Sequence, residues 1–412
     1  MKAVTIIGMG DDGCVGLSSK AAGAISRAQV LAGGQRHLDF FPQFEGRRII
    51  FKGEIIRSVQ EIAELCADHT VCILASGDPL FYGIGGLIGK KIGIEHVDII
   101  PAPSSVQLAF SRIGIKWDDA EIISLHGRSI QGFIGRLQRV AKVACLTDAI
   151  NSPQAIARYL REFEEVSWKA YVCENLGGQG ERVREFSIPQ LCEVDGISDL
   201  NVLLLLRNTE GWRRPQTLAN LDEDEYAKRM PKNGLITKRE VRVLSLAALQ
   251  LRPDSIVWDI GAGSGSVSIE SAKLAYEGEV YAVEIDSECA EYCRQNVRTH
   301  RVDNVRVIEE RAPAALLKLK DPDAIFVGGS KGSMAEIIQV CLGRLKPKGR
   351  LVVNAITLDN VAEAYQAFRA QGMVPELSVL NISRGQKLAH YLRYEALNPI
   401  HIFSVTKDEE TA

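Results

Sequence analysis

The chain has 412 residues, of which 46% are hydrophobic and 25% charged, and a formal net charge of -3 at pH 7. This length predicts two or three domains whose cores are large enough to fold without disulfides or structural metals. The near balance of charge argues against a generally nucleic-acid-binding surface, and the sequence has no long apolar run that would span a membrane. The N-terminus lacks the features of a signal peptide, so we expect a cytoplasmic protein.

The nine cysteines and seven histidines are dispersed along the sequence. Cys289 and Cys293 are four residues apart and would share one helix face, but no second Cys or His pair lies near them in sequence. We therefore expect free thiols in a reducing compartment, and no metal site.

The first half alternates short apolar runs with amphipathic segments. Helices are expected at residues 54–68 and 152–164. The clearest strands are expected at residues 4–7, 71–75, 97–100, 143–146, 170–173 and 202–206. This alternation predicts an α/β domain with a largely parallel sheet.

Composition changes at residues 208–225, which contain Gly211, Pro215 and an acidic run that ends at Asp224. This stretch is interpreted as a linker between domains at residues 1–207 and 226–412. After it, a helix is expected at residues 241–249. Strands are expected at residues 256–260, 280–284, 305–309, 324–327 and 350–354. The sequence thus predicts two α/β domains of similar size.

A glycine-rich loop follows the first strand of the second half, where residues 255–265 read SIVWDIGAGSG. Glycines in such a loop allow positive φ angles and close approach of the backbone to a ligand. The next strand ends at Glu284, whose carboxylate can accept hydrogen bonds from both hydroxyls of a ribose. Together these features predict a nucleoside-type cofactor site, and the spacing alone leaves NAD and S-adenosylmethionine (SAM) as alternatives.

The loop begins at Asp259 and follows the D-x-G-x-G-x-G pattern of class I SAM methyltransferases, whereas the usual NAD pattern would place glycine at Ser266. Methyltransferases that act on base amines typically carry an [N/D]-P-P-[Y/F] motif where this chain has FVGGS at residues 326–330. The second half resembles the decarboxylating precorrin methyltransferases of cobalamin synthesis. The segments that carry the resemblance are GLITK (234–238), the glycine loop, Val283-Glu284, ERAP (310–313), VGGS (327–330) and VNA (353–355).

This resemblance implies a Rossmann-like class I SAM methyltransferase domain. Relatives often have Asp where this chain has Arg311, so we expect the adenine contact to come from the backbone of Ala312. The residues expected to bind SAM are Thr237, Gly261, Ala262, Gly263, Ser264, Gly265, Glu284 and Ala312.

In the first half, polar turns at residues 76–79, 103–105 and 126–128 each follow an apolar strand. The carboxyl ends of parallel strands meet at one sheet edge, where ligands bind. These turns, together with the glycines after the first strand, resemble the tetrapyrrole methylases over roughly residues 1–207. One departure is Asp11, where that family often has proline.

The resemblance implies a two-lobed α/β domain that holds SAM between its lobes and methylates ring carbon 5. It also brings the region at residues 174–178 close to SAM. The residues expected to bind SAM are Ser76, Gly77, Asp78, Phe81, Ser104 and Ser105, and those expected to contact the tetrapyrrole are Gly8 and Gly10.

The order of the two halves implies a bifunctional enzyme of cobalamin synthesis with one SAM site per domain. It would methylate ring carbons 5 and 15 of a tetrapyrrole and decarboxylate the acetate at ring carbon 12. The acidic substrate calls for cations and polar groups in each cleft. Catalytic candidates are Arg128, Lys331 and Asn354, and further substrate-binding candidates are Gly328, Gly329, Ser330, Arg384 and Lys387. His126 is interpreted either as a ligand group or as a turn residue.

Two other functions compete with this interpretation. An RNA methyltransferase would need a basic face with interleaved aromatic residues, but aromatic residues make up only 6% of the chain. A non-catalytic SAM-binding regulator would bind the cofactor without forming product. Metal-free and cobalt-containing substrates both remain open, and the fusion of the two halves favours the metal-free one. We expect a homo-oligomer and no nucleic-acid or membrane partner.

Overall fold

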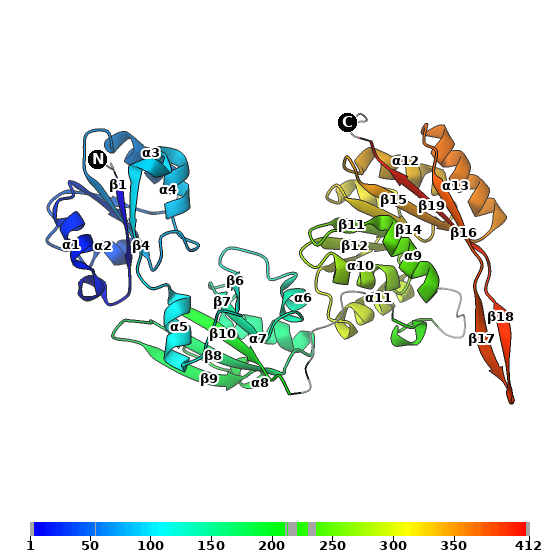
Figure 1. Cartoon of the computed structure of the whole chain (residues 1–412), viewed down its shortest axis with the longest axis horizontal. Coiled ribbons are helices and arrows are strands. Elements are labelled where there is room, and N and C mark those ends of the chain that lie inside the picture. Colours follow the sequence, from blue (N-terminus) through cyan, green and yellow to red (C-terminus); the bar gives the residue numbers. More distant parts are fainter. Residues whose placement is uncertain (1–3, 54, 211, 213–220, 230–235, 409–412) are drawn as a thin grey trace. The chain divides into compact units, whose positions relative to one another are not determined.

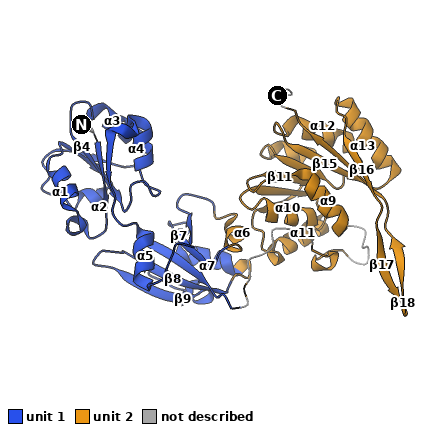
Figure 2. Ribbon diagram, viewed as in Figure 1, with its two compact units in different colours: residues 1–129, 140–161, 166–211 blue, residues 130–139, 162–165, 212–412 orange. Residues whose placement is uncertain are grey.

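The structure, a computed structural model, describes residues 4–53, 55–210, 212, 221–229 and 236–408. The chain forms two compact units (Figure 2). Unit 1 comprises residues 1–129, 140–161 and 166–211, and unit 2 comprises residues 130–139, 162–165 and 212–412. The main division falls within the predicted linker, of which residues 211 and 213–220 lie outside the described residues. None of the described helices is both long and apolar enough to cross a membrane.

The first lobe of unit 1 is a parallel five-stranded sheet in the order β3-β2-β4-β1-β5, with helices on both faces (Figure 1). Because neighbouring side chains of a strand point to opposite faces, Ile6 and Ile7 of β1 belong to two different cores. Ile6 packs with α3 and α4, and Ile7 packs with α1 and α2. The elements are β1 (Val4–Met9), α1 (Ser19–Ser26), β2 (Val30–Gly33), α2 (Gln35–Leu38), β3 (Arg47–Ile50), α3 (Ile55–Leu65), β4 (Val71–Ser76), α4 (Gly85–Ile92) and β5 (Val97–Ile100).

The second lobe is a five-stranded sheet in the order β6-β7-β10-β8-β9. The prediction of a largely parallel sheet is wrong for this lobe, because only β6 and β7 pair in parallel. The segment at residues 175–181, between β8 and β9, is too short for the crossover that a parallel pair requires. The elements are α5 (Ser105–Ile113), β6 (Glu121–Ser124), β7 (Lys142–Leu146), α7 (Pro153–Glu162), β8 (Trp168–Glu174), β9 (Arg182–Ser187), α8 (Ile188–Leu191) and β10 (Asn201–Arg207).

Unit 2 contains a seven-stranded sheet in the order β13-β12-β11-β14-β15-β19-β16. Strands β11 to β15 are parallel, and β19 runs antiparallel to both β15 and β16. The elements are α6 (Phe133–Leu137), α9 (Arg239–Leu249), β11 (Ile256–Ile260), α10 (Ser266–Leu274), β12 (Glu279–Glu284), α11 (Ser287–Thr299), β13 (Val305–Glu309), β14 (Ala324–Val327), α12 (Met334–Arg344), β15 (Arg350–Ala355), α13 (Leu358–Ala370), β16 (Glu376–Leu380) and β19 (Ile400–Thr406). The chain runs outward from β11 to β13 and then returns to β14 on the other side of β11. Ligands of such sheets bind at the carboxyl ends of the strands beside this reversal.

A two-stranded hairpin extends from the sheet of unit 2 (Figure 1). It consists of β17 (Ser383–Leu388) and β18 (Tyr391–Ala396), which pair with each other. Every side chain of β18 is exposed, including those of Tyr391, Leu392 and Tyr394. The sequence analysis did not predict this hairpin.

Candidate active sites in the two units

The glycine loop of unit 2 connects β11 to α10 and lies at the carboxyl end of β11. Gly261, Gly263 and Gly265 all have positive φ angles, between 58° and 81°. A Cβ atom on Gly261 would lie 2.6 Å from the carbonyl oxygen of Gly329, so the loops that follow β11 and β14 touch at this point. A Cβ atom on Gly265 would lie 2.4 Å from the Cys293 sulfur. These positions therefore require glycine for both conformation and space.

Glu284, at the end of β12, faces the same loop. Its Oε2 atom accepts a hydrogen bond from the Gly263 N–H at 2.8 Å, and its Oε1 atom accepts from the Ile285 and Asp286 N–H groups at 2.8 and 2.9 Å. The carboxylate is therefore fixed in orientation. Oε2 accepts only one of these bonds, so it keeps acceptor capacity for a hydroxyl of a nucleoside ligand.

Asp259 lies beneath the loop and is fully buried. Its Oδ2 atom accepts a hydrogen bond from the Ser268 hydroxyl, and its Oδ1 atom has no hydrogen-bond partner among the described residues. Burial raises the pKa of Asp259 to about 7. Asp259 thus connects β11 to α10, behind the loop.

A cavity of about 790 Å³ opens at this end of the sheet. Its size suits a small-molecule site. The sequence-predicted residues that line it are Thr237, Gly261, Ala262, Gly263, Glu284, Ala312, Gly328, Gly329, Ser330, Lys331 and Asn354. The structure thus gathers into one cavity residues that are spread over more than a hundred positions of the sequence.

Four sequence-predicted residues of unit 2 do not line this cavity. Ser264 is 5% exposed, and its carbonyl accepts a hydrogen bond from the Asn296 side chain at 2.9 Å. Gly265 packs against Cys293. Arg384 and Lys387 both lie on β17. Their predicted contact with substrate therefore remains a prediction without support from the cavity.

The cavity also contains residues to which the sequence analysis assigned no role in the site. Arg229, Lys238 and Arg311 add three cations to its lining, beside Lys331. Arg229 forms an ion pair with Glu288 at 3.2 Å. No motif signalled Arg229, because it follows the predicted linker and becomes a neighbour of the cavity only through folding.

Asn354, a predicted catalytic residue, is held by a buried hydroxyl. Its Nδ2 atom donates to the Oγ atom of Ser245 at 2.9 Å. Ser245 is fully buried on α9, and its hydroxyl also donates to the Val241 carbonyl at 2.8 Å. Ser245, which is not among the residues that line the cavity, therefore fixes the orientation of the Asn354 amide.

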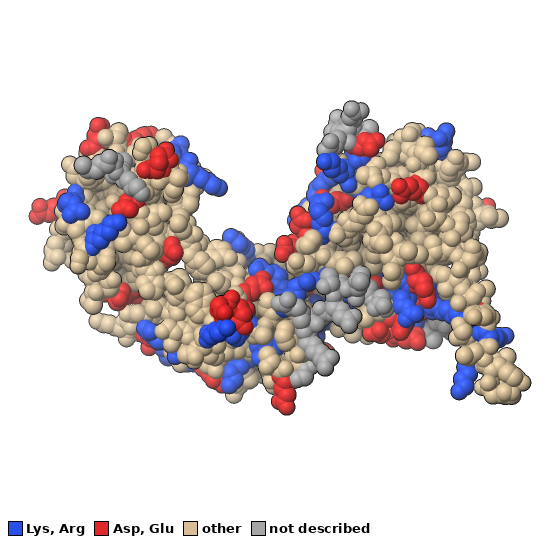
Figure 3. Space-filling model, in the orientation of Figure 1, with Lys and Arg blue, Asp and Glu red and all other residues tan. Residues whose placement is uncertain are grey.

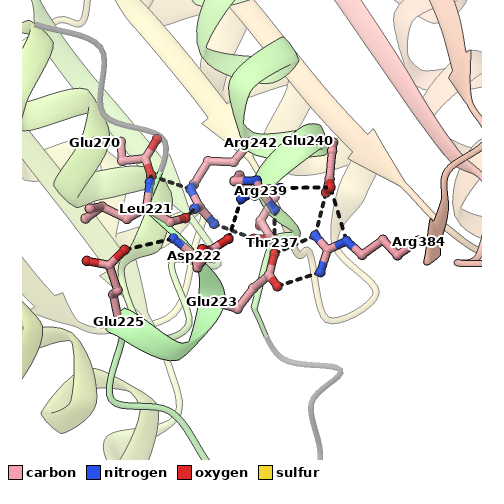
Figure 4. A network of polar contacts seen from close by, with 10 residues as sticks. All are labelled: Leu221, Asp222, Glu223, Glu225, Thr237, Arg239, Glu240, Arg242, Glu270 and Arg384. Atoms are coloured by element: carbon pink, nitrogen blue, oxygen red, sulfur yellow. Dashed lines mark hydrogen bonds and ion pairs between the residues drawn. The ribbon is translucent and has the colours of Figure 1, made fainter. Parts of the chain in front are cut away.

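The segment at residues 221–229 is part of unit 2 and packs against its other elements, although its first part was predicted as linker. Glu223 forms ion pairs with Arg384, with N–O distances of 2.8 and 2.9 Å, and Arg384 also binds Glu240 (Figure 4). The Arg384 guanidinium lowers the pKa of Glu223 to about 2. A capping box of Asp222 and Glu225 starts the short 3-10 helix η3 (Glu223–Glu225). Asp222 and Glu225 have the spacing of a capping box in the sequence, a signal of folded structure that the sequence analysis did not use.

Unit 1 has its own cavity, of about 400 Å³, between its two lobes. The first lobe contributes the carboxyl ends of β1 and β4, and the second lobe contributes residues such as Leu176 and Asn201. The sequence-predicted residues that line it are Gly10, Ser76, Gly77, Asp78, Phe81, Ser104 and Ser105. The structure thus brings together Gly10, after the first strand, and the predicted turns at residues 76–79 and 103–105.

Gly8 and Arg128 do not line this cavity. A Cβ atom on Gly8 would lie 2.0 Å from the Gly77 carbonyl oxygen. The absence of a side chain at Gly8 therefore lets β1 approach the turn that follows β4. The Arg128 guanidinium lies 5.6 Å from the ring centre of Tyr82, which does line the cavity. His126 hydrogen-bonds the Thr147 carbonyl through Nδ1 at 3.1 Å, which supports its interpretation as a turn residue.

The unit 1 cavity also holds a polar cluster that the sequence analysis missed. Asp11, Arg36 and His37 line it together with Ser76. Asp11 was noted only as a departure from a family pattern. Arg36 and His37 lie on the short helix α2, and no motif signalled them.

Both halves match known families. Residues 3–192 match the tetrapyrrole (corrin/porphyrin) methylases, and residues 229–407 match the precorrin methyltransferase domain. Over 406 residues, or 98% of its length, the chain is 34% identical to a Sinorhizobium protein named precorrin-6Y C(5,15)-methyltransferase [decarboxylating], and it covers 96% of that protein. The chain belongs to this precorrin-6Y methyltransferase family. Membership confirms the predicted fold class and the predicted enzyme class, and it implies SAM as the methyl donor.

Relatives of about half the length also match this chain. The cobalt-precorrin-7 C(5)-methyltransferase of Salmonella typhimurium is 36% identical over 203 residues, which are 49% of this chain and 98% of that protein. A Pyrobaculum calidifontis protein named probable cobalt-precorrin-6B C(15)-methyltransferase (decarboxylating) is 35% identical over 171 residues, which are 41% of this chain and 87% of that protein. The two activities thus occur in separate relatives.

Proposed function

We propose that this chain converts precorrin-6Y to precorrin-8 by two ring-carbon methylations and one decarboxylation, in two separate sites. The observation that carries the proposal is the presence of one cavity in each unit, both built at the carboxyl ends of parallel strands. The half-length relatives with one activity each support the same division.

In unit 1, SAM would bind in the cavity between the lobes, beside the turns that begin at Ser76 and Ser104. Ser104 also caps α5, since its Oγ atom accepts a hydrogen bond from the Gln107 N–H at 3.2 Å. This bond ties the end of the turn to the first turn of α5. Methylation of ring carbon 5 is assigned to this unit.

In unit 2, the lining fits a nucleoside ligand, because Oε2 of Glu284 presents a fixed acceptor to the cavity beside the glycine loop. When bound, SAM supplies an electrophilic methyl group. The cationic residues of the lining would hold the substrate's carboxylates, and Asn354 would orient the ring. Methylation of ring carbon 15 is assigned to this unit.

Neither methylation requires a strong base for the attack, because reduced tetrapyrrole carbons are already nucleophilic. The protein has to align the reacting atoms and exclude water. Decarboxylation is assigned to unit 2. The acetate at ring carbon 12 is conjugated with the macrocycle, which takes the electron pair as carbon dioxide leaves.

We further propose a metal-free substrate. The full-length relatives from Sinorhizobium and Mycobacterium tuberculosis are named for precorrin-6Y, whereas the half-length relatives are named for cobalt-precorrins. A cytoplasmic enzyme without a nucleic-acid partner fits the mixed charge of the surface, where acidic and basic side chains are interspersed (Figure 3).

Self-association is proposed through the β17–β18 hairpin. Leu392 and Tyr394 lie on one face of β18 and are 79% and 84% exposed, which favours burial against a second copy. Replacement of both by serine should reduce the particle mass in sedimentation analysis. An unchanged mass would contradict this assignment of the interface.

Mass spectrometry of precorrin-6Y, generated in situ and incubated with the protein and SAM, tests the proposed function. A gain of two methyl groups with loss of one carbon dioxide is expected. Turnover of only the cobalt-containing form would contradict the metal-free assignment. No mass change with either substrate would contradict the function itself, and methyl transfer to RNA would replace it.

A further inference from the structure

The polar cluster in the unit 1 cavity is centred on the Ser76 hydroxyl. Its Oγ atom lies 3.2 Å from Nε2 of His37 and 3.3 Å from Nη2 of Arg36. The Nη1 atom of Arg36 lies 3.3 Å from an Oδ atom of Asp11. Ser76 comes from β4, Arg36 and His37 from α2, and Asp11 from the loop after β1. Residues of β4 and α2 thus meet at the Ser76 hydroxyl, and Asp11 joins the cluster through Arg36.

The directions of these hydrogen bonds follow from the chemistry of the groups. A guanidinium has no acceptor, so Arg36 donates to the Ser76 oxygen. The Ser76 hydroxyl hydrogen is then free to point to His37. Arg36 also lies 3.4 Å from Nε2 of His37, and this contact too requires Nε2 to accept. We infer a neutral imidazole with its hydrogen on Nδ1 and a lone pair on Nε2, facing the hydroxyl.

The proposed function leaves one proton without an acceptor. A bridging carbon of the tetrapyrrole carries one hydrogen, and after methylation it carries both that hydrogen and the methyl group. Loss of this proton returns the C–H electron pair to the macrocycle and restores its conjugation. The methylated ring is cationic and hence acidic, so a weak neutral base is sufficient.

We propose that Ser76 and His37 form a proton relay that accepts this proton in unit 1. The C–H bond breaks, its proton goes to the Ser76 oxygen, and the hydroxyl proton goes to Nε2 of His37. Ser76 would touch the substrate, and His37 would act through it. The inference rests on the assignment of a ring-carbon methylation to unit 1.

Two features keep the relay ready for a new cycle. His37 is 6% exposed, and burial together with the charge of Arg36 lowers its pKa to about 4, so the imidazole is neutral before the reaction. Afterwards the imidazolium lies beside Arg36, and this repulsion favours release of the proton to water. Asp11 is the acidic group that faces the cluster, and it offsets part of the Arg36 charge.

The test uses the full-length protein, SAM and precorrin-6Y that carries deuterium at ring carbon 5. In the wild-type protein, deuterium should be lost as fast as the methyl group at ring carbon 5 is gained. His37→Gln should slow the loss of deuterium by about 100-fold, the usual effect of removing a general base, while methyl gain continues. Quenched samples should therefore contain molecules with both methyl groups that still retain deuterium.

His96→Gln is the matched control, since His96 is exposed and lies outside the cavity lining. It should behave as the wild type. Loss of deuterium that keeps pace with methyl gain in His37→Gln would overturn the proposal, as would equal slowing of the two steps, which indicates a structural role. A wild-type protein that gains no methyl groups would instead refute the proposed function.

Discussion

Arg242 and Glu270 form an ion pair that is excluded from solvent. The Nε atom of Arg242 on α9 lies 2.7 Å from Oε1 of Glu270 on α10, and both side chains are 0% exposed. The Tyr226 hydroxyl donates to the same carboxylate oxygen at 3.0 Å, and Nη1 of Arg242 donates to the Thr237 carbonyl at 2.7 Å. One buried pair therefore holds two helices, the 221–229 segment and a residue of the cavity lining (Figure 4).

Arg242→Met should destabilise unit 2 by about 3–5 kcal/mol, because it leaves the Glu270 carboxylate buried without its partner. Hydrogen exchange of the α9 and α10 amides measures this loss within the full-length chain. The double variant Arg242→Met/Glu270→Leu should recover most of the stability, since it removes both charges. If the double variant loses as much stability as the two single variants together, the two residues are not coupled and this account is wrong.

Gly261→Ala should abolish measurable SAM binding at one of the two proposed sites. The new Cβ atom would lie within 3 Å of the Gly329 backbone, at a φ of +72°, so the loops would have to separate. Isothermal titration calorimetry measures the number of SAM molecules that bind to each chain. Gly343→Ala is the control, because Gly343 lies on α12 with no atom within 4 Å of an added Cβ, and it should stabilise the helix by about 0.5–1 kcal/mol. Two intact sites in Gly261→Ala would contradict the assigned loop.

Arg384→Gln should raise the pKa of Glu223 from about 2 towards its ordinary value, because Glu223 loses its main hydrogen-bond donor. NMR titration of the carboxyl carbon measures this shift. The ion pair stabilises the fold above the ordinary pKa of Glu223, and this stabilisation is lost as the pH falls towards 2. The free energy of unfolding of the variant should therefore depend less on pH over that acidic range. Lys387→Gln on the same strand should change neither quantity. A large rise in the Michaelis constant of Arg384→Gln without a pKa shift would favour the predicted role in substrate binding.

His37 should make the stability of unit 1 depend on pH between about 6.5 and 4. Its folded-state pKa lies below the ordinary value, so the unfolded chain binds a proton in this range that the folded chain does not bind. Stability is therefore full above pH 6.5 and falls as the pH falls, by on the order of 2 kcal/mol at pH 4.5. The charged groups that face His37 are Arg36 and Asp11. His37→Gln should reduce this acid-induced loss in hydrogen-exchange measurements, and an undiminished loss would contradict the assigned pKa.

The sequence predicted the parts of the fold that depend on local pattern. The strand that ends at Ile260, its glycine loop and the carboxylate of Glu284 were all identified, because strand, loop and acidic terminus have a fixed spacing in a βαβ unit. The strands expected at residues 305–309 and 324–327 coincide with β13 and β14. Their apolar runs lie between clear turn signals.

The parts that depend on contacts between distant residues were missed. The exposed pattern of β9 gives little apolar signal, and its antiparallel partner β8 sets its place in the sheet. The Arg384 guanidinium was expected to meet substrate, whereas it binds two carboxylates that are 144 and 161 residues away. Ion pairs of this kind follow from tertiary packing, and no local pattern encodes them.

The measurement that tests the central claim most directly is the number of methyl groups that precorrin-6Y gains with the Glu284→Ala variant. Glu291→Ala is the matched control, because Glu291 lies exposed on α11 outside the cavity lining. Two independent sites predict a product with one added methyl group for Glu284→Ala and two for Glu291→Ala. A product of Glu284→Ala with two added methyl groups would contradict the assignment of one methylation to each unit.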